Sequence, residues 1–363
     1  MTNTPKWCII ISCKEKIIAK GENMNITLSQ KQLLPILRDL TPITKSAYIR
    51  SLQCILVEVR GTFVYFTATD GSIRVTRRIT NQWAENESLL FPAQRFFEAV
   101  KQLKGQIVIT DTGLSDATQS VTLDTMGDNE YPLPPKMGGI SVMSEGLGRV
   151  IGRIARFMPN KNDNTQLNYV QMVFKDDILT VAGGNSVAML REELPLEGQL
   201  HHTYWIPSHF AKLLPDGKVI IEIAGDTISV SDFDGNQWFS VGNPTTGPNW
   251  ASINAGSEFV VDFQTTPQYP TKVAKVEWHH ISSLVYITCV DGGMQVVCGD
   301  MKSQIPAQYN QPFPPLIMRP QDWTAAMKIG SPVRMSWKTP RPDFGATVRL
   351  DIDGSTVYIL AKV

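Results

Sequence analysis

A unit of strand, proline, helix and strand recurs three times in this chain of 363 residues. The copies read LLFPAQRFFEAVKQLKGQIVIT, YWIPSHFAKLLPDGKVIIEI and LIMRPQDWTAAMKIGSPVRMSW, starting at residues 89, 204 and 316. Their prolines are Pro92, Pro207 and Pro320, so the intervals are 115 and 113 residues. Proline suits the first turn of a helix, where its missing N–H costs nothing. A fixed long period indicates a repeated structural module, so we expect three copies of about 115 residues each.

A second half of the module recurs with the same order. LVEVRGTFVYFTATDGSIRV (56–75) is echoed by MVFKDDILTVAGGNSVAML (172–190) and, more faintly, by YITCVDGGMQVVCGDM (286–301). Each segment alternates with period two around a polar turn, which predicts a pair of strands. Helix-period stretches precede these pairs at 29–40, 144–158 and 270–278. The pattern predicts an α+β fold of three tandem domains, each with two helices packed against antiparallel sheets.

The composition limits the kinds of function. Basic and acidic residues balance at 34 each, so any affinity for nucleic acid must come from where the charges lie. The five cysteines are scattered without a CxxC pair, which argues against a disulfide framework or zinc ribbon and fits a reducing cytosol. No apolar run approaches the ~20 residues of a membrane span. We expect a cytoplasmic protein without a membrane segment, metal or cofactor.

The first helix-period stretch of the second copy, SEGLGRVIGRIARFM, is the most informative. Its apolar residues follow the i, i+3, i+4, i+7 rule, which predicts a buried face. Arg149, Arg153 and Arg156 recur at i, i+4 and i+7, which predicts one exposed basic stripe on this helix. Recurrent basic faces on the same elements would bind phosphates without reading bases.

The full set of candidate phosphate-binding cations comes from the expected helices and their ends. These residues are Lys31, Arg38, Lys45, Arg95, Lys101, Arg149, Arg153, Arg156, Lys212, Lys272, Lys275 and Lys328. For any one of them, solvation of an exposed helix face is the alternative explanation. The prediction therefore depends on the set and above all on the arginine stripe.

The same helix opens with GxGxxxG, from Gly146 to Gly152, which resembles a dinucleotide fingerprint. A true fingerprint needs a βαβ unit and an acidic residue that ends its second strand. Here a polar loop and a hairpin follow, and the first copy has no glycine at this place. The chain has no HExxH, GxSxG or P-loop motif, and its two His-His pairs would point to opposite faces of a strand. We expect no enzyme, with nucleotide binding as an open alternative.

The order of these segments resembles the bacterial β sliding clamp, the processivity factor of the replicative DNA polymerase. MNITLSQKQLLPIL is similar to a clamp's opening strand and helix, LLFPAQRFFEAVKQL to its strand-proline-helix segment, and SVTLDTMGDNEYP to the tail of its first domain. The likeness runs from Met24 to Val363 and implies domains at 24–138, 139–255 and 256–363. Residues 1–23 are then an N-terminal extension or a misassigned start.

The resemblance implies a function. Two three-domain chains would join head to tail, domain one against domain three, as a homodimeric ring lined by helices. The ring would encircle duplex DNA and slide, because charge without base contacts holds it nonspecifically. A DNA polymerase, a clamp loader and other DNA-processing proteins would insert short apolar peptides into a pocket between domains two and three.

The implied peptide pocket departs from the family pattern. Where the second domain of the family usually has Thr-Asp-Gly-His-Arg-Leu, this chain reads GGNSVA over 183–188, and a sharper ATDG lies in the first copy at 68–71. The expected pocket residues are Tyr169, Gly183, Asn185, Ser186, Val187, Pro248, Ile253, Val357, Ile359 and Ala361. A slip of one residue near the C-terminus would reverse which side chains face the pocket. Besides a clamp, the altered pocket leaves open a scaffold that binds proteins but does not close around DNA.

Overall fold

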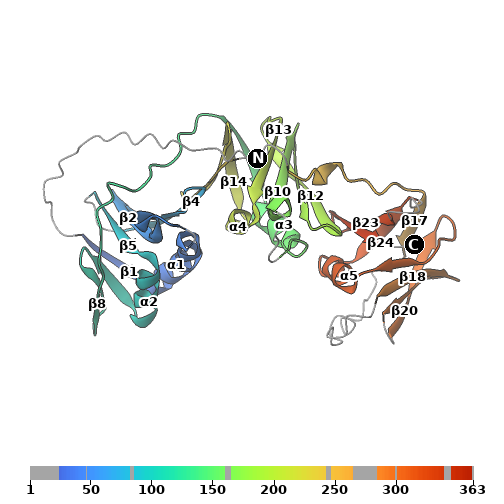
Figure 1. Ribbon diagram of the computed structural model, residues 1–363, viewed down its shortest axis with the longest axis horizontal. Helices are drawn as coiled ribbons and strands as arrows, with labels where there is room; N and C mark the ends of the chain where they lie inside the picture. Colours follow the sequence, from blue (N-terminus) through green and yellow to red (C-terminus); the bar gives the residue numbers. More distant parts are fainter. Residues whose placement is uncertain are drawn as a thin grey trace, which may run out of the picture.

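The computed structural model describes residues 24–45, 47–81, 86–159, 165–242, 247–264, 284–298, 301–338 and 345–361. Figure 1 shows three bodies that follow one another along an arc, from blue through green to red. The first body holds elements β1 to β8, the second β9 to β16 and the third β17 to β24. The predicted α+β class with three repeated domains is confirmed, and the predicted boundaries after residues 138 and 255 stay predictions.

The bounds of the elements follow the chain. The first body contains β1 (Asn25–Ser29), α1 (Gln30–Thr44), η1 (Arg50–Gln53), β2 (Cys54–Arg60), β3 (Phe63–Thr69), β4 (Ile73–Thr80), β5 (Glu87–Pro92), α2 (Ala93–Gln102), β6 (Gln106–Thr110), β7 (Gly113–Ser115) and β8 (Ser120–Thr122). The second contains β9 (Ile140–Glu145), α3 (Leu147–Ile154), η2 (Thr165–Asn168), β10 (Tyr169–Lys175), β11 (Ile178–Gly184), β12 (Ala188–Glu197), β13 (His202–Pro207), α4 (Ser208–Ala211), β14 (Lys218–Ala224), β15 (Thr227–Asp232) and β16 (Gln237–Val241). After η3 (Trp250–Ser252), the third contains β17 (Phe259–Phe263), β18 (Val285–Val290), β19 (Gly293–Cys298), β20 (Met301–Tyr309), β21 (Leu316–Met318), α5 (Pro320–Met327), β22 (Pro332–Trp337), β23 (Ala346–Ile352) and β24 (Ser355–Ala361).

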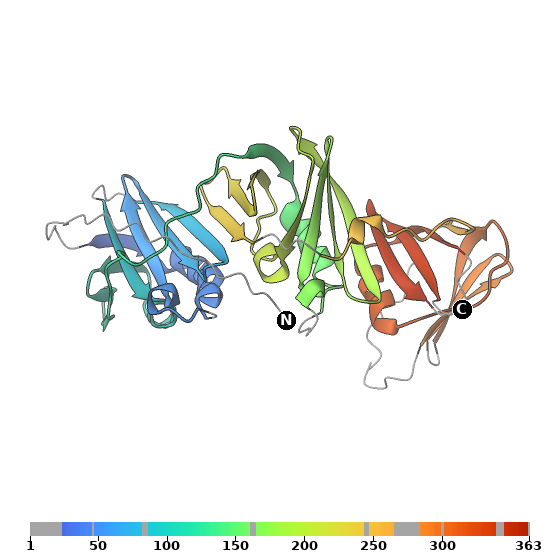
Figure 2. The same cartoon turned by 45° about the horizontal axis from the view of Figure 1, so that its top comes forward.

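Two strand ladders cross from one body to the next. Strand β4 of the first body pairs antiparallel with β16 of the second, with Val75 opposite Trp238. Strand β12 of the second body pairs antiparallel with β24 of the third, with Glu192 opposite Ser355. Figure 2 shows these neighbouring strands at the two junctions. Backbone hydrogen bonds therefore join the bodies, which a flexible linker alone would not do.

The connecting segments are also held by arginine side chains, of which Arg74 is buried and Arg191 is half-buried. Arg74 on β4 donates to the carbonyl oxygen of Pro132 at 2.6 Å, and its guanidinium lies over the ring of Tyr131. Burial raises the pKa of the Tyr131 hydroxyl well above its usual range, and that hydroxyl donates to the carbonyl oxygen of Thr67. In the second body, Arg191 donates to the carbonyl oxygen of Ala251 at 3.2 Å. Each connector is thus held by the domain that precedes it.

Helix α1 shows why the sequence forms these elements. Ser29 and Gln32 form a capping box: the backbone N–H of Gln32 donates to Ser29 Oγ at 3.3 Å, and the backbone N–H of Ser29 donates to Gln32 Oε1 at 3.1 Å. Leu33, Leu37 and Leu40 lie fully buried on the face that packs into the core. The two prolines inside the helix, at 35 and 42, are on its exposed side. The helix tolerates them because tertiary packing of its leucine face stabilises it.

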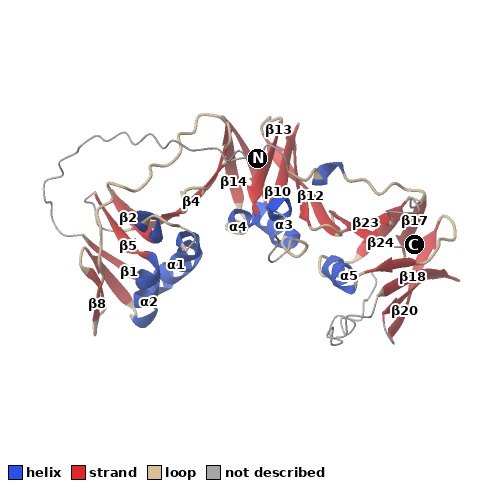
Figure 3. Ribbon diagram, viewed as in Figure 1, coloured by secondary structure: helices blue, strands red, loops and turns tan. Residues whose placement is uncertain are grey.

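The α-helices α1 to α5 lie on the concave side of the arc, among the segments that Figure 3 draws in blue. The described residues contain five α-helices, of which α4 is a single turn. The expected first helix of the third copy, at 270–278, falls outside the described residues. Of the three predicted helix prolines, Pro320 is the first residue of α5, whereas Pro92 and Pro207 end the preceding strands and stand just before α2 and α4.

The turn between the paired strands recurs with the same hydrogen bonds in the first two bodies. Oδ1 of Asp70 accepts from the backbone N–H groups of Ser72 and Ile73. Oδ1 of Asn185 accepts from the backbone N–H groups two and three residues further on, at 2.8 and 2.9 Å. Asn185 is therefore the counterpart of Asp70, which makes the sequence match GGNS with ATDG. The match to the family expected from the sequence places the family's aspartate at Gly184, which is one residue before Asn185.

The Asn185 side chain carries a third hydrogen bond, because its Nδ2 donates to the carbonyl oxygen of Phe157 at 2.7 Å. We expect Asn185→Ala to lower the free energy of unfolding by about 1–2 kcal/mol, since one donor and two acceptor bonds are lost together. Asn185→Asp is the matched control, because it keeps the acceptor and copies Asp70. Urea unfolding midpoints measure the difference. An alanine variant as stable as the parent would show that the turn needs no side chain.

Candidate functional site

The candidate cations on the concave-side helices divide into free and paired groups. Six of them form neither an ion pair nor a side-chain hydrogen bond with any described residue: Lys31, Arg38, Lys45, Arg149, Lys212 and Lys328. All six are exposed. They come from α1, α3 and the ends of α1, α4 and α5, so every body contributes at least one. These positions suit a surface that attracts phosphates.

The arginine stripe of the second body is not uniformly exposed, which corrects the expectation from periodicity. Arg149 is exposed, but Arg153 is half-buried and its Nη1 lies 3.2 Å from Oε1 of Glu192, a nearly buried carboxylate. The same nitrogen donates to Ser355 Oγ in the third body at 3.2 Å. Nη1 of Arg156 donates to the carbonyl oxygen of Lys328, also in the third body, at 2.7 Å. Two of the three arginines therefore join the second and third bodies.

The remaining candidate cations are partly neutralised or lie outside the described residues. Arg95 pairs with Asp124 at 3.1 Å, with both side chains mostly exposed. Lys101 pairs with Glu98 at 3.0 Å and lies against the ring of Phe97. Exposed pairs of this kind contribute little and can exchange partners when an anion approaches. Lys272 and Lys275 fall outside the described residues.

Part of the expected peptide pocket faces the wrong side of its sheet. Val357, Ile359 and Ala361 on β24 are buried in the main core. Gly183 faces the same way, because a Cβ added there would lie 2.7 Å from the side chain of Ile154 on α3. Side chains alternate along a strand, so the outer face belongs to their neighbours, such as Tyr358. These four residues are therefore not walls of an outer pocket.

The outer face at this junction is filled by the chain itself. Ala182, Met189, Trp250, Ala255 and Tyr358 form a separate buried cluster, and Ile253 packs against it. Trp250 and Tyr358 are only 6% and 3% exposed. The other expected pocket residues are not part of this cluster: Tyr169, Asn185, Ser186, Val187 and Pro248 are half-buried or exposed.

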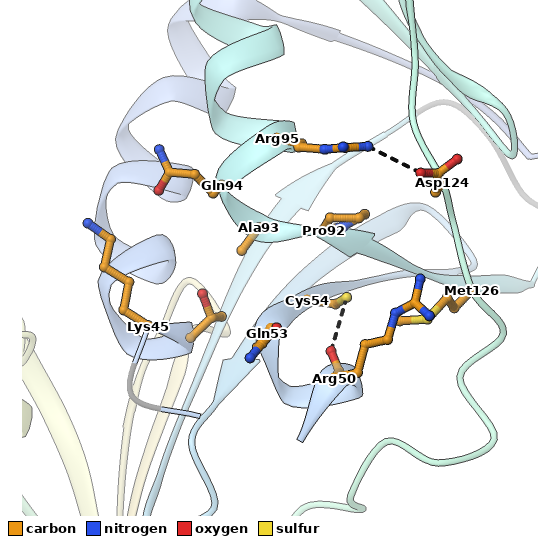
Figure 4. Close-up of a pocket in the computed structure, with 11 residues that line it drawn as sticks. Lys45, Arg50, Gln53, Cys54, Pro92, Ala93, Gln94, Arg95, Asp124 and Met126 are labelled. Carbon is orange, nitrogen blue, oxygen red and sulfur yellow. Dashed lines mark hydrogen bonds and ion pairs between the residues drawn. The ribbon is translucent and has the colours of Figure 1, made fainter. Parts of the chain in front are cut away.

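A hollow of about 410 Å³ opens instead in the first body, which the sequence did not indicate. Figure 4 shows it between the end of α1, the turn η1 and the start of α2. Lys45, Arg50 and Arg95 bring positive charge to its lining, together with the thiol of Cys54 and the thioether of Met126. No motif marks it, because its residues come from four separate segments of the chain.

The glycine-rich start of α3 is occupied by protein contacts. The backbone N–H groups of Gly146 and Gly148 donate to the carbonyl oxygens of Asp216 and Pro215 at 3.0 and 2.9 Å. A Cβ at Gly148 would lie 2.7 Å from the carbonyl oxygen of Leu214, so the glycine permits close packing of the helix on this turn. A pyrophosphate needs these N–H groups free. The nucleotide alternative therefore loses its binding site.

The described residues contain neither a candidate metal-binding cluster nor a candidate membrane-spanning helix. No group of three or more His, Cys, Asp or Glu side chains is placed there to hold a metal ion. No helix among them is long and apolar enough to cross a membrane. His201 lies 3.8 Å from Asp176, with both side chains exposed. The pair at 279 and 280 lies outside the described residues.

Comparison with known proteins agrees with this geometry. A family model for the N-terminal domain of the DNA polymerase III beta subunit matches residues 24–135. Three solved structures superpose over most of the chain with a TM-score of 0.77: a putative DNA polymerase III beta subunit from Eubacterium rectale and sliding clamps from Helicobacter pylori and Bacillus subtilis. The chain shares the fold of the bacterial β sliding clamps.

The sequence similarity within this fold family is low. The three structures are 14%, 14% and 15% identical to this chain, and the superpositions cover 93–94% of it and 98–100% of each of them. A curated beta sliding clamp from Chlamydia trachomatis is 22% identical over 200 residues, which is 51% of this chain. The matched stretch spans 47% of that relative's length. The clamp fold is thus kept while most side chains differ.

Proposed function

We propose that this chain forms half of a closed ring that encircles duplex DNA, slides along it and tethers a DNA polymerase. The observation that carries the proposal is the placement of the helices along the concave side of the arc, with unpaired cations on α1, α3 and the ends of α1, α4 and α5. Two such arcs joined head to tail would enclose a channel lined by these helices. The joined sheets of neighbouring bodies would form its outer rim.

The charges explain how such a ring could hold DNA without stopping on it. Exposed lysines and arginines attract phosphates without reading sequence, so they would hold duplex DNA nonspecifically. A neutral chain with unpaired cations on its concave-side helices combines local attraction with weak overall charge. The ring would therefore depend on its closure for retention and on its inner charges for alignment.

Partner proteins would bind through short peptides, as suggested by the Helicobacter pylori clamp, which was solved with a DNA ligase peptide. In this chain the expected site lies at the junction of the second and third bodies. Tyr169, Pro248 and Ile253 would supply apolar contacts there, beside the turn with Asn185, Ser186 and Val187. A polymerase and a clamp loader are the partner classes we propose. The ring would act on DNA in the cytoplasm and perform no catalysis of its own.

One observation supports a second candidate function, a protein-binding scaffold that does not close. The cluster around Trp250 and Tyr358 fills the junction where partner peptides would enter. A chain with a changed partner site could compete for other proteins without encircling DNA. The two functions differ in their oligomeric state, because a ring needs two chains of 40.4 kDa.

A retention assay separates the two candidates. The chain is loaded on nicked circular duplex, and its release is followed before and after the circle is cut to a linear molecule. A ring should stay on the circle and leave within the dead time after linearisation, at a mass near twice 40.4 kDa by light scattering. Equal release from both forms, together with a monomeric mass at all dilutions, would overturn the ring and favour the scaffold.

The contribution of the concave-side cations to DNA binding is tested with a separate variant. Lys31, Arg38, Arg149 and Lys212 changed together to glutamine remove four unpaired concave-side cations. We expect the slope of log affinity against log salt to fall by about 3–4 for linear duplex, because each lost phosphate contact contributes about 0.9. The matched control changes four exposed lysines on strands and connectors, Lys136, Lys175, Lys302 and Lys338. An equal loss in both variants would show that overall charge, and not the concave surface, attracts DNA.

A further inference from the structure

The hollow in the first body is a built feature of the fold and not a gap at an edge. Its rim is formed by the last residues of α1, by η1 and by the first turn of α2, and its volume is about 410 Å³. Pockets that bind ligands commonly measure 300–1,000 Å³. Cys54 and Pro92, which lie opposite each other in the β2–β5 ladder, form part of its lining.

The lining has an excess of positive charge. It contains three cations, Lys45, Arg50 and Arg95, and one carboxylate, Asp124, so its formal charge is 3 − 1 = +2. Asp124 already pairs with Arg95 at 3.1 Å, whereas Lys45 and Arg50 form no ion pair with any described residue. Burial raises the pKa of the Cys54 thiol, so the sulfur adds no negative charge at neutral pH. The hollow therefore favours an anionic group.

The uncharged part of the lining combines the polar side chains of Thr44, Gln53 and Gln94 with an apolar portion. Pro92, Ala93 and Met126 line the hollow beside the cations. Between Lys45 and Arg50 the chain also presents Tyr48 and Ile49, which are 101% and 55% exposed. A small anion would leave these two side chains in water, while an extended ligand could cover them. Large exposed apolar side chains next to a pocket are typical of a protein-binding surface.

The second body differs at the matching place. Its equivalent ladder pair is Tyr169 opposite Pro207, so a tyrosine stands where the first body has the much smaller Cys54. The helix that follows, α4, is a single turn, whereas α2 has ten residues. A small side chain and a longer helix thus leave room for the hollow in the first body.

We propose that this hollow binds a short acidic segment of a partner protein. A carboxylate of the segment lies beside Lys45 and Arg50, and an adjoining apolar side chain lies against Pro92 and Met126. The segment then continues over Tyr48 and Ile49. Duplex DNA offers phosphates but no apolar side chain to bury, so the apolar lining favours a peptide. This site is independent of ring closure, because all its residues belong to one body.

The methyl group of Met126 reports directly on the site. In the full chain labelled with ¹³C-methyl methionine, one of 13 signals is assigned to Met126 by its loss in Met126→Leu. The probes are acetyl-Asp-Ile-Asp-Val-amide and its counterpart with asparagine in place of both aspartates. We expect the acidic peptide to shift the Met126 signal saturably. The asparagine peptide should bind at least about tenfold more weakly, because it cannot form charge-assisted hydrogen bonds.

Arg50→Gln tests the charge without touching the core, because Arg50 is exposed and unpaired. This change should weaken binding of the acidic peptide about tenfold. The control Lys104→Gln removes an exposed cation of the same body outside the hollow and should leave the affinity for the peptide unchanged. Retention on circular DNA should be unchanged in Arg50→Gln, which keeps this test separate from the ring. The proposal is overturned if neither peptide shifts Met126, if both peptides bind equally, or if inorganic phosphate or duplex DNA binds there more tightly than the acidic peptide.

Discussion

Replacing Trp238 with alanine is expected to lower the free energy of unfolding by about 3–5 kcal/mol and to loosen the first body from the second. Trp238 is a fully buried residue on β16, the strand that continues the sheet of the first body. Truncation of a buried tryptophan removes its transfer free energy and leaves a cavity that the surrounding strands cannot close completely. The cavity would lie at the junction of two bodies, so both would lose packing.

The contacts of Trp238 explain the coupling. The guanidinium of Arg77, on β4, lies 4.6 Å from the centre of its ring. Arg77 Nη2 in turn lies 2.7 Å from Oδ2 of Asp39 on α1. A line of contacts thus runs from a concave-side helix of the first body to the sheet of the second. This line helps to fix the angle between the two bodies, on which a closed ring would depend.

Two matched variants separate the parts of this effect. Trp238→Phe keeps an aromatic ring under Arg77. It removes an indole N–H that has no hydrogen-bond partner among the described residues. The variant should therefore lower the free energy of unfolding by less than about 2 kcal/mol. Arg77→Gln keeps the tryptophan and removes the cation. Urea unfolding measures the stabilities, and small-angle scattering measures the angle between the bodies. An alanine variant with unchanged unfolding midpoint and scattering would show that the backbone ladder alone joins them.

The repeated architecture could be predicted because it depends on local signals that occur more than once. The prolines before or within the helices, the leucine face of α1 and the alternating strands are readable in a single segment. The two ladders that join the bodies are not, because β4 and β16 have the same alternation as any half-buried strand. Only the folded chain places Trp238 opposite Val75.

The candidate site was predictable only in part, for the same physical reason. Helical periodicity placed Arg149, Arg153 and Arg156 on one polar face, but it cannot show that two of them form hydrogen bonds with another domain. The sequence allowed two phases for β24 that differ by one residue. The structure places Val357 and Ile359 in the main core and Tyr358 in the separate cluster on the outer face. The hollow with Arg50 and Met126 was missed, since its residues share no motif.

Arg153→Met is expected to cost about 3 kcal/mol, because it leaves the Glu192 carboxylate buried without its partner. The Glu192 side chain is 7% exposed, and removal of one member of such a pair is far more costly than removal of both. The same change removes the hydrogen bond from Arg153 to Ser355 and so weakens the junction with the third body. The Arg153→Met variant should therefore be less stable than the parent whether or not Arg153 contacts DNA.

The double variant Arg153→Met with Glu192→Leu distinguishes a structural arginine from one that contacts phosphate. It removes the buried charge together with its partner, so stability should return to within about 1 kcal/mol of the parent. If Arg153 acts only at the junction, retention on circular DNA should return as well. If stability returns and retention does not, Arg153 contacts the phosphates and the arginine stripe acts as its periodicity indicated. A single variant as stable as the parent would contradict the buried pair itself. The half-buried position of Arg153, with both of its bonds directed into protein, leads us to expect that stability and retention recover together.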